Sequence, residues 1–295
     1  MSSINIEQPL ISVILPTYNH AKFIGKAIES VINQTHENLE LIIIDNYSED
    51  DTEKIILTYK DARIIYLKFR NNGVIAASRN HGIKKAKGKF SAFLDSDDWW
   101  SLNKLQICID HINDNTDCVY HDMRIIREKS GLFQSKIIKS RQLKSPVLID
   151  LLVNGNTIGT SSVVIRKRLL DQIGGFNESP DLIAAEDYNA WLRIAQVTDG
   201  FCHIPKCLGF YMMHDQGISR KDTSNPARCA SASFVHLLSD KQRRSLESDL
   251  KYTKGRHAFL SQNYSIAREN LLFSARYGKS IIKLKSLWML INSLR

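Results

Sequence analysis

The sequence lacks the patterns that mark a secreted, membrane-spanning or zinc-binding protein. Its five cysteines are odd in number and form no C-x-x-C pair with accompanying histidines, so we expect reduced thiols in a cytosolic protein. No stretch reaches the roughly 18–20 uninterrupted apolar residues that a membrane-spanning helix needs. The first nine residues are polar and lack the features of a signal peptide.

The positive charge is confined to one end of the chain. Residues 220–295 hold 15 Lys and Arg against 5 Asp and Glu, whereas residues 1–219 hold 25 against 26. No zinc finger or RNP-like aromatic motif accompanies the basic residues, so no nucleic-acid partner is expected. Anionic lipid head groups fit a basic tail better.

The first hundred residues alternate between buried strands and helices. Strands are predicted at 11–15, 39–44, 63–67 and 91–94, and helices at 21–34, 75–86 and from Asp51 through Tyr59. Alternating strands and helices indicate a mostly parallel sheet flanked by helices, an α/β fold. Polar clusters at 16–19, 45–48 and 95–98 follow three of the strands, and we expect them to converge because ligands bind beyond the carboxyl ends of parallel strands.

The cluster that follows the fourth strand is the most informative of the three. Asp95, Asp97 and Asp98 place three carboxylates within four positions. Like charges so close repel unless a cation or hydrogen-bond donors lie between them, and hard divalent cations prefer carboxylate and phosphate oxygens. A metal-bridged nucleotide site is one interpretation, and a solvated turn before a helix is the other.

The second half is less regular. Strands are expected near 117–120, 162–165, 201–204 and 208–213, helices at 146–153, 167–173 and from Ala184, and a loop over 126–145. Gly174-Gly175 has the composition of a helix C-cap. The basic tail is predicted to be helical, with candidate helices at 250–262, 264–277 and 280–295.

These motifs resemble those of family-2 glycosyltransferases, enzymes with a GT-A fold that use nucleotide sugars. The matching segments are Ser12 to Asn19, Ile44 to Thr52 (with Asn46-Tyr47 in place of Asp-Gly), Ala77 to Gly82, Gly88, Leu94 to Asp98, Gly174-Gly175-Phe176 and Glu186-Asp187. They span about residues 9–219. The resemblance implies a catalytic domain over 1–219, with a nucleotide-sugar-binding half at 1–100 and an acceptor-binding half at 101–219, followed by a helical region at 220–295.

The resemblance also implies roles for particular residues on the donor side. The loop Pro16, Thr17, Tyr18 and Asn19 would hold the base and ribose together with Asp45, and Arg79 would face the diphosphate. Asp95, Ser96 and Asp97 complete the implied nucleotide-sugar site. A planar guanidinium suits phosphate oxygens, although a surface position on a helix is the alternative for Arg79.

A divalent metal, Mn²⁺ or Mg²⁺, would neutralise charge on the leaving nucleotide. Its ligands would come from Asp97 first, then Asp98 and His214. Met212 stands where the family often has an arginine, which places any diphosphate contact from that strand in doubt. A partly exposed loop histidine is the alternative for His214.

The implied reaction is an inverting transfer of a sugar, here expected from UDP, to an acceptor hydroxyl. Asp187 would act as the base, with Glu186 as the alternative candidate and helix capping as the structural explanation for both. The sugar and acceptor side would be lined by Tyr120, Asp122, Trp99 and Trp100. A core position for Tyr120 and a surface position for Asp122 explain them equally well, and large aromatic residues after a strand are more often core residues.

The basic tail suggests how such an enzyme meets its acceptor. Residues 280–295 are apolar over much of a helix and basic at intervals, which favours either an interfacial helix with Trp288 at the boundary or a helix packed on the protein. A peripheral enzyme on the cytoplasmic face of the inner membrane fits a lipid-diphosphate-linked acceptor, as in bacterial surface polysaccharide and O-antigen (lipopolysaccharide) synthesis.

Two other classes share parts of this pattern. A sugar nucleotidyltransferase also uses clustered carboxylates, but we would expect glycine and basic residues in its first loop, and Pro16 to Asn19 contains neither. An inactive glycan- or nucleotide-binding protein would keep the fold without needing Asp95, Asp97, Asp98 and Asp187.

Overall fold

Two compact units make up the computed structural model, which describes residues 8–127, 136–214 and 221–294. The first unit comprises Met1–Gln142, Ile158–Glu178 and Gly200–His214, and the second comprises Leu143–Thr157, Ser179–Asp199 and Asp215–Arg295. Every described strand belongs to the first unit, and the described elements of the second are helical.

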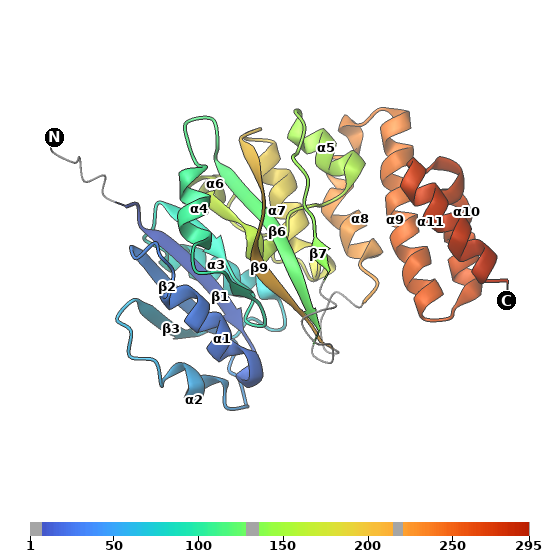
Figure 1. The fold of residues 1–295 in the computed structure, drawn as a ribbon. Helices are drawn as coiled ribbons and strands as arrows, with labels where there is room; N and C mark the ends of the chain where they lie inside the picture. Colours follow the sequence, from blue (N-terminus) through green and yellow to red (C-terminus); the bar gives the residue numbers. More distant parts are fainter. Residues whose placement is uncertain (1–7, 128–135, 215–220, 295) are drawn as a thin grey trace. The chain divides into compact units, whose positions relative to one another are not determined.

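The first unit is built on a single mixed sheet (Figure 1). Its strands are β1 (Ile11–Thr17), β2 (Leu39–Asp45), β3 (Ile64–Lys68), β4 (Phe90–Phe93), β5 (Trp99–Trp100), β6 (Cys118–Arg127), β7 (Ile137–Ile138), β8 (Val164–Arg166) and β9 (Phe201–Met213). The order is β3-β2-β1-β4-β8-β6-β9-β5, with β7 paired to β6. Strands β1 to β4 run parallel, so their carboxyl ends share one edge.

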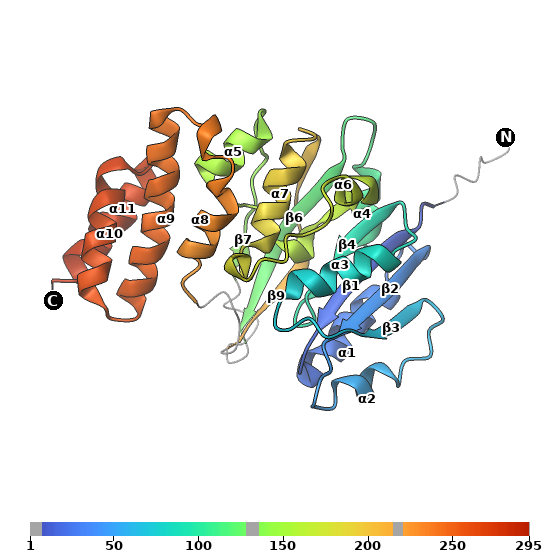
Figure 2. The same cartoon turned by 180° about the vertical axis from the view of Figure 1, so that it is seen from behind.

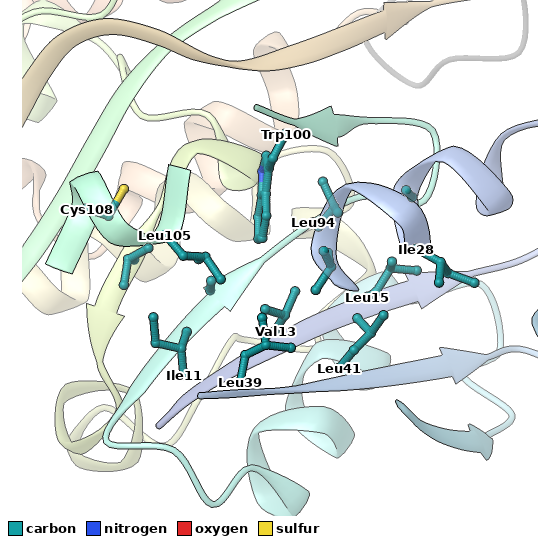
Figure 3. Packing of buried hydrophobic residues seen from close by; sticks show 14 of the residues in the cluster. Ile11, Val13, Leu15, Ile28, Leu39, Leu41, Leu94, Trp100, Leu105 and Cys108 are labelled. Carbon is teal, nitrogen blue, oxygen red and sulfur yellow. The ribbon is translucent and has the colours of Figure 1, made fainter. Parts of the chain in front are cut away.

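Alternate residues of the central strands face opposite sides of this sheet. Ile11, Val13 and Leu15 belong to a buried cluster with helices α1 (Ala21–Ile32) and α4 (Lys104–Asp110), and Figure 3 shows part of that packing. Helix α3 (Ile75–Lys85) covers the other face of the sheet (Figure 2). Ile14 points to that face, and a Cβ on Gly82 of α3 would lie only 2.7 Å from its Cγ2. Burial on both faces explains why β1 and β2 are mostly apolar, and their buried polar residues Ser12 and Glu40 hydrogen-bond to each other (2.6 Å).

Two shorter helices complete the first unit. They are α2 (Thr52–Ile56) and α6 (Lys167–Gln172). Helix α6 ends at Gly174 and Gly175, both with positive φ (70° and 76°), as the predicted C-cap requires.

The second unit is a set of packed helices. They are α5 (Val147–Asn154), α7 (Glu186–Ala195), α8 (Ser224–Ala232), α9 (Asp240–Leu260), α10 (Tyr264–Tyr277) and α11 (Ser280–Asn292). Helices α9, α10 and α11 pack on one another around Ala258, Ala267, Leu271 and Met289. A capping box between Ser239 and Gln242 fixes the start of α9.

The α/β class is confirmed, but the sheet is mixed rather than mostly parallel. Strands β8 and β7 pair antiparallel with β4 and β6, and β5 pairs antiparallel with β9. Strand β9 runs through Pro205 as one strand, whereas the sequence suggested two. Strand β5 and helix α4 were not predicted, and β7 lies inside the segment predicted as a loop, whereas α8 lies in the tail that was predicted to be helical. Only part of the predicted 126–145 loop can be compared, because 128–135 lie outside the described residues.

The division into units groups α5 and α7 with the C-terminal helices. It reflects packing and does not test which residues bind donor or acceptor, so the catalytic domain at 1–219 stays a prediction. Among the described helices, none is long and apolar enough to cross a membrane. All five cysteines are free thiols.

Candidate active site

The loops that follow β1 and β2 are joined by hydrogen bonds at the carboxyl edge of the sheet. Asn19 has a left-handed backbone (φ 51°); its Oδ1 accepts from the N–H of Glu49 (2.8 Å) and its N–H donates to Oγ of Ser48 (2.9 Å). The N–H of His20 donates to Oγ1 of Thr52 (2.9 Å). A non-glycine residue keeps this conformation only where its surroundings hold it. The two loops therefore form one connected wall.

The predicted base-binding residues occupy different depths in this wall. Pro16 and Thr17 are buried in the last positions of β1, whereas Tyr18 is 49% exposed. Asp45 is fully buried at the end of β2, where its Oδ1 accepts from the N–H and Oγ of Ser48 and its Oδ2 accepts from Tyr66 Oη (2.7 Å). Asp45 therefore orders the second loop, and a contact with a base stays a prediction.

Arg79 and Asp95 form an ion pair at the same edge. Nη2 of Arg79 lies 2.8 Å from Oδ1 of Asp95, and the guanidinium carbon lies 5.5 Å from the ring centroid of Phe176. The Arg79 side chain is almost fully buried, whereas that of Asp95 is 31% exposed. A buried guanidinium needs such a partner because an uncompensated charge there is strongly destabilising. The alternative of a surface position for Arg79 is wrong.

The Gly-Gly-Phe motif is explained by the residue that follows Arg79. Asn80 accepts on Oδ1 from the N–H of Phe176 (2.7 Å) and donates through Nδ2 to the carbonyl of Phe176 and to Glu178 (both 2.8 Å). A Cβ on Gly175 would overlap Oδ1 of Asn80. Glycine is required there, and through Asn80 the segment after α6 is attached to the helix that carries Arg79.

Asp95 to Asp98 form a tight turn after β4. The N–H of Asp98 donates to the carbonyl of Asp95 (2.9 Å), and the N–H of Met212 donates to Oδ1 of Asp98 (3.0 Å). Asp98 is buried and also bonded to Ser161. Burial, and next the negative charges of Asp97 and Asp95, hold the pKa of the Asp98 carboxyl well above its ordinary value. Asp98 thus joins the turn to β9.

Two histidines contact the turn between these carboxylates. Nδ1 of His20 lies 2.6 Å from Oγ of Ser96, and Nε2 of His214 lies 2.9 Å from Oδ2 of Asp97. The two rings meet edge to face with centroids 6.1 Å apart. Burial lowers the pKa of His20, with the charge of Asp97 acting against it and that of His214 acting with it. His214 is buried rather than loop-exposed.

The carboxylates of Asp95, Asp97 and Asp98 bring negatively charged oxygens together, and divalent cations prefer such oxygen ligands. Burial and then the charges of Asp97 and Asp95 raise the pKa of Asp98, and a divalent cation held by these oxygens would offset the repulsion among the three carboxylates. Within the part of the chain that is described, however, no three His, Cys, Asp or Glu side chains are grouped closely enough to hold a metal by themselves. A phosphate-bearing ligand would have to supply further oxygens.

The two tryptophans are core residues at this edge. Trp99 stacks on Phe210 with centroids 5.2 Å apart, and Nζ of Lys26 lies 3.3 Å from its ring centroid. Nε1 of Trp100 donates to the carbonyl of Ser161 (2.7 Å). Both side chains are buried, as the prediction of core positions requires. Stacking of either ring on a sugar stays a prediction.

Tyr120 and Asp122 are also buried, two positions apart on β6. Oη of Tyr120 donates to the carbonyl of Arg141 (2.6 Å). Oδ1 of Asp122 accepts from the N–H of Ser140 and pairs with Nε2 of His203, each at 2.8 Å. These contacts fix the segment beyond β6, and no observation gives either residue a ligand.

Glu186 and Asp187 begin α7 in the second unit. Glu186 is buried and Asp187 is half-buried, and the N–H of Tyr188 lies 2.6 Å from Oδ1 of Asp187. Ala184, two residues before the helix, has φ 76°, a strained value for a side chain with a Cβ. Both carboxylates lie in the first turn of α7, where negative charge interacts favourably with the helix dipole.

Sequence reasoning missed His20 and Ser161. His20 adjoins the first motif, and its position directly after Asn19 at the sheet edge was an available signal. Ser161 lies in a short 3₁₀ turn (Thr160–Ser162) where no pattern marks it, yet its Oγ accepts from the N–H of Asp95 (3.2 Å). Such a contact depends on the antiparallel pairing of β8 with β4, which the sequence does not reveal.

A family model described as glycosyl transferase family 2 matches residues 12–174. This match covers more than half of the chain and includes the loops, Arg79 and the Asp95–Asp98 turn. The chain belongs to this family, and the resemblance drawn from its motifs is confirmed.

Three similar proteins add detail. An uncharacterised glycosyltransferase of Rickettsia prowazekii is 36% identical over 66% of this chain and 61% of its own length. The UDP-Glc:alpha-D-GlcNAc-diphosphoundecaprenol beta-1,3-glucosyltransferase WfgD of Escherichia coli is 34% identical over 63% of this chain and 69% of its own length. The mannosyltransferase PcManGT of Pyrobaculum calidifontis, solved with GDP-Man and Mn²⁺, is 16% identical over 98% of this chain and 82% of its own, with a TM-score of 0.64. The chain thus spans about three fifths of the Rickettsia relative, and the structural likeness supports the GT-A fold.

Proposed function

We propose that this protein is an inverting, metal-dependent glycosyltransferase that moves a sugar from a UDP-sugar to a hydroxyl of a glycan carried on a lipid diphosphate. The observation that carries the proposal is the Asp95–Asp98 turn, with Arg79 on one side and His214 on the other, at the carboxyl edge of β1 to β4. The UDP donor and diphospholipid acceptor in the name of the E. coli relative support the choice of substrates.

The donor side follows from the exposed groups of this edge. Tyr18 and Asn19 are the exposed members of the first loop and are proposed to contact the base and ribose, with Asp45 ordering the second loop beside them. Arg79 is proposed to attract the diphosphate, because its buried guanidinium is held in a fixed position by Asp95. Ser96 is held by His20 and is proposed to orient a donor hydroxyl.

The proposed cation ligand is Asp97, with Asp95 contributing through water. His214 is also a predicted ligand, but its Nε2 lies 2.9 Å from Oδ2 of Asp97, so it is proposed to orient that carboxylate instead. Carboxylate oxygens fit Mn²⁺ or Mg²⁺, and the Mn²⁺ bound with GDP-Man in the archaeal mannosyltransferase supports a metal. When bound, the ion supplies Lewis-acid neutralisation of the leaving diphosphate. Asp98 is also a predicted ligand; its hydrogen bonds to Met212 and Ser161 favour a positioning role instead.

Asp187 is proposed as the general base, because it is the half-buried and Glu186 the buried member of the pair. An acceptor hydroxyl becomes a competent nucleophile as its proton passes to the carboxylate. Its oxygen then forms a bond to the anomeric carbon while the bond from that carbon to the diphosphate oxygen breaks on the opposite face. This displacement inverts the configuration of the sugar and releases the nucleoside diphosphate.

Association with a membrane surface is proposed for α11. Ile281, Leu284, Trp288 and Ile291 recur at spacings of three and four and are each about 60–70% exposed, while Met289 faces the packed side. Lys283 and Lys285 adjoin this apolar face. Exposed apolar residues beside basic ones suit a helix lying in the head-group plane of an anionic bilayer.

Nucleotide binding tests the proposal with the full chain. Thermal unfolding with UDP, GDP, dTDP and CMP, each with and without Mn²⁺, should give a metal-dependent rise in Tm with UDP, because a ligand of the native state stabilises it by mass action. No shift with any nucleotide would favour an inactive protein or a structural role for the turn.

A further inference from the structure

The second unit contains a pocket that the roles assigned above leave without a ligand. Its volume is about 430 Å³, within the range of roughly 300–1,000 Å³ that small-molecule sites occupy. Residues from α5, α7, α8, α9 and α11 contribute to its walls, and all of them belong to the second unit. Asp187, the proposed base, is one of those residues, and half of the rest come from helices α8, α9 and α11.

The chemistry of the walls combines apolar surface with carboxylates and hydroxyls. Leu152, Leu246, Leu250 and Ile282 supply apolar area, and Thr223, Thr253 and Tyr252 supply hydroxyl-bearing side chains. Asp187 and Asp249 supply two carboxylates, and no lysine or arginine is found among the described residues of the walls. A ligand here meets apolar faces and hydrogen-bonding oxygens, while the Lys279 ammonium next to the pocket is paired with Asp249 and is not one of the wall residues. An anionic ligand is disfavoured because like charges repel strongly away from bulk water.

Asp249 has an oxygen that lacks a protein partner. Its Oδ2 lies 3.3 Å from Nζ of Lys279, whereas Oδ1 is buried and has no hydrogen-bond partner among the described residues. Burial, opposed by Lys279, raises the pKa of the Asp249 carboxyl. A buried acceptor without a donor is costly, and a ligand hydroxyl would satisfy it. Lys279 is itself held by the carbonyl of Val153 (2.6 Å), so the carboxylate has a fixed position.

We propose that this pocket binds an uncharged sugar ring of the acceptor, with a ring hydroxyl donating to Asp249, and that its two carboxylates exclude acceptors bearing a uronic acid or phosphate at this position. The proposal rests on the function proposed above, since it places the acceptor beside Asp187. A neutral sugar matches the walls because it offers hydroxyl donors at its rim and apolar C–H faces. The C-terminal helices thereby select the acceptor.

The test compares two ligands that differ only in charge. Binding of methyl glucoside and methyl glucuronide to the full chain is measured at pH 7 by saturation-transfer NMR titration. The glucoside should bind at least about tenfold more tightly, and Asp249→Asn should raise the ratio of glucuronide to glucoside affinity about tenfold, because it removes one negative charge and leaves Lys279 unpaired. Lys254→Ala, on the exposed side of α9, is the matched control and should leave both affinities unchanged.

A second variant addresses the volume of the pocket. Ala227→Phe places a ring inside it and should abolish binding of both glycosides while leaving the Tm shift given by UDP and Mn²⁺ unaltered. Equal affinity for the two glycosides, binding of neither, or an unchanged affinity ratio in Asp249→Asn would overturn the proposal. Glycoside binding without any nucleotide shift in the natural protein would instead overturn the proposed function and leave the pocket assignment standing.

Discussion

Nε2 of His214 lies 2.9 Å from Oδ2 of Asp97, and this contact joins the end of β9 to the turn after β4, positions 117 residues apart in the chain. The two side chains are 6% and 18% exposed, so the pair is largely shielded from water while one carboxylate face stays open. In the proposed site His214 orients the carboxylate that takes the cation, which is how outer partners commonly fix metal ligands.

Asp97→Asn should abolish metal-dependent nucleotide binding. The amide keeps the size of the side chain but removes the charge that a cation needs, so Mn²⁺ should no longer enhance the Tm shift given by UDP. Asp114→Asn, on an exposed loop, serves as the control. Calorimetry that finds ordinary metal-dependent UDP binding in Asp97→Asn would refute the metal assignment.

Gly175→Ala should destabilise the protein more than Gly174→Ala. Both residues have positive φ, for which a Cβ costs about 1–2 kcal/mol, but only at Gly175 would the Cβ overlap Oδ1 of Asn80. Displacing Asn80 also breaks its bonds to Phe176, each worth about 1 kcal/mol. Urea unfolding measures both variants, and equal losses would show that the Asn80 contact carries little of the stability.

His121 should make the protein less stable in acid. Nδ1 of His121 lies 2.8 Å from the carbonyl of Asp122, and its buried Nε2 has no partner among the described residues. Burial, and next the charge of Lys104, lower the pKa of His121 to about 3. The unfolded chain therefore binds a proton more readily than the native state between about pH 6.5 and 3, and the free energy of unfolding falls as pH drops through this range, by up to about 1.4 kcal/mol per pH unit.

The variant His121→Asn isolates this effect. It keeps a donor near the position of Nδ1 and removes the titrating group, so its loss of stability between about pH 6.5 and 4 should be smaller than that of the natural protein. Urea unfolding at a series of pH values gives both curves. Parallel curves would mean that His121 does not contribute to the acid dependence.

The paired change Ile281→Ser with Leu284→Ser should weaken binding to anionic liposomes without lowering Tm, because both side chains are exposed on α11. Leu57→Ser, an exposed leucine in the first unit, is the control for loss of apolar surface. Binding should also fall with added salt, because the attraction of Lys283 and Lys285 to lipid is screened. Sedimentation with liposomes measures all three, and unchanged binding would exclude α11 as a membrane-binding element.

The parallel half of the fold and its edge were predictable, because their signals are local. Apolar runs such as Ile11–Leu15 specify buried strands, and the polar residues after them must share an edge once the strands run parallel. The antiparallel strands could not be predicted in the same way. Trp99-Trp100 is too short to show the two-residue period of a strand. The contact of Ser161 with Asp95 depends on β8 lying beside β4. The buried Lys104, held by the carbonyl of Val163 and the ring of Trp100, shows the same limit.

The type of a residue does not by itself tell whether its side chain is exposed in the site or buried beneath it. The three aspartates predicted for the nucleotide-sugar and metal site differ in exposure. Asp95 and Asp97 are the more accessible, whereas Asp98 is buried and accepts a hydrogen bond from Met212 on a distant strand. From the sequence, Tyr120 fits a sugar contact and a core position equally well, and Trp99 fits the core better; both are buried against partners far along the chain. Local motifs therefore located the edge, while tertiary contacts decided which side chains it presents.

The most direct measurement is the anomeric configuration of the product, followed by NMR with a UDP-sugar, Mn²⁺ and a methyl glycoside acceptor, for the natural protein and for Asp187→Asn. We predict a product of configuration opposite to that of the donor sugar, and a loss of turnover of about 100-fold or more in Asp187→Asn with donor affinity intact, because the base acts on the acceptor. A product of retained configuration, or full turnover without Asp187, would contradict the proposed mechanism.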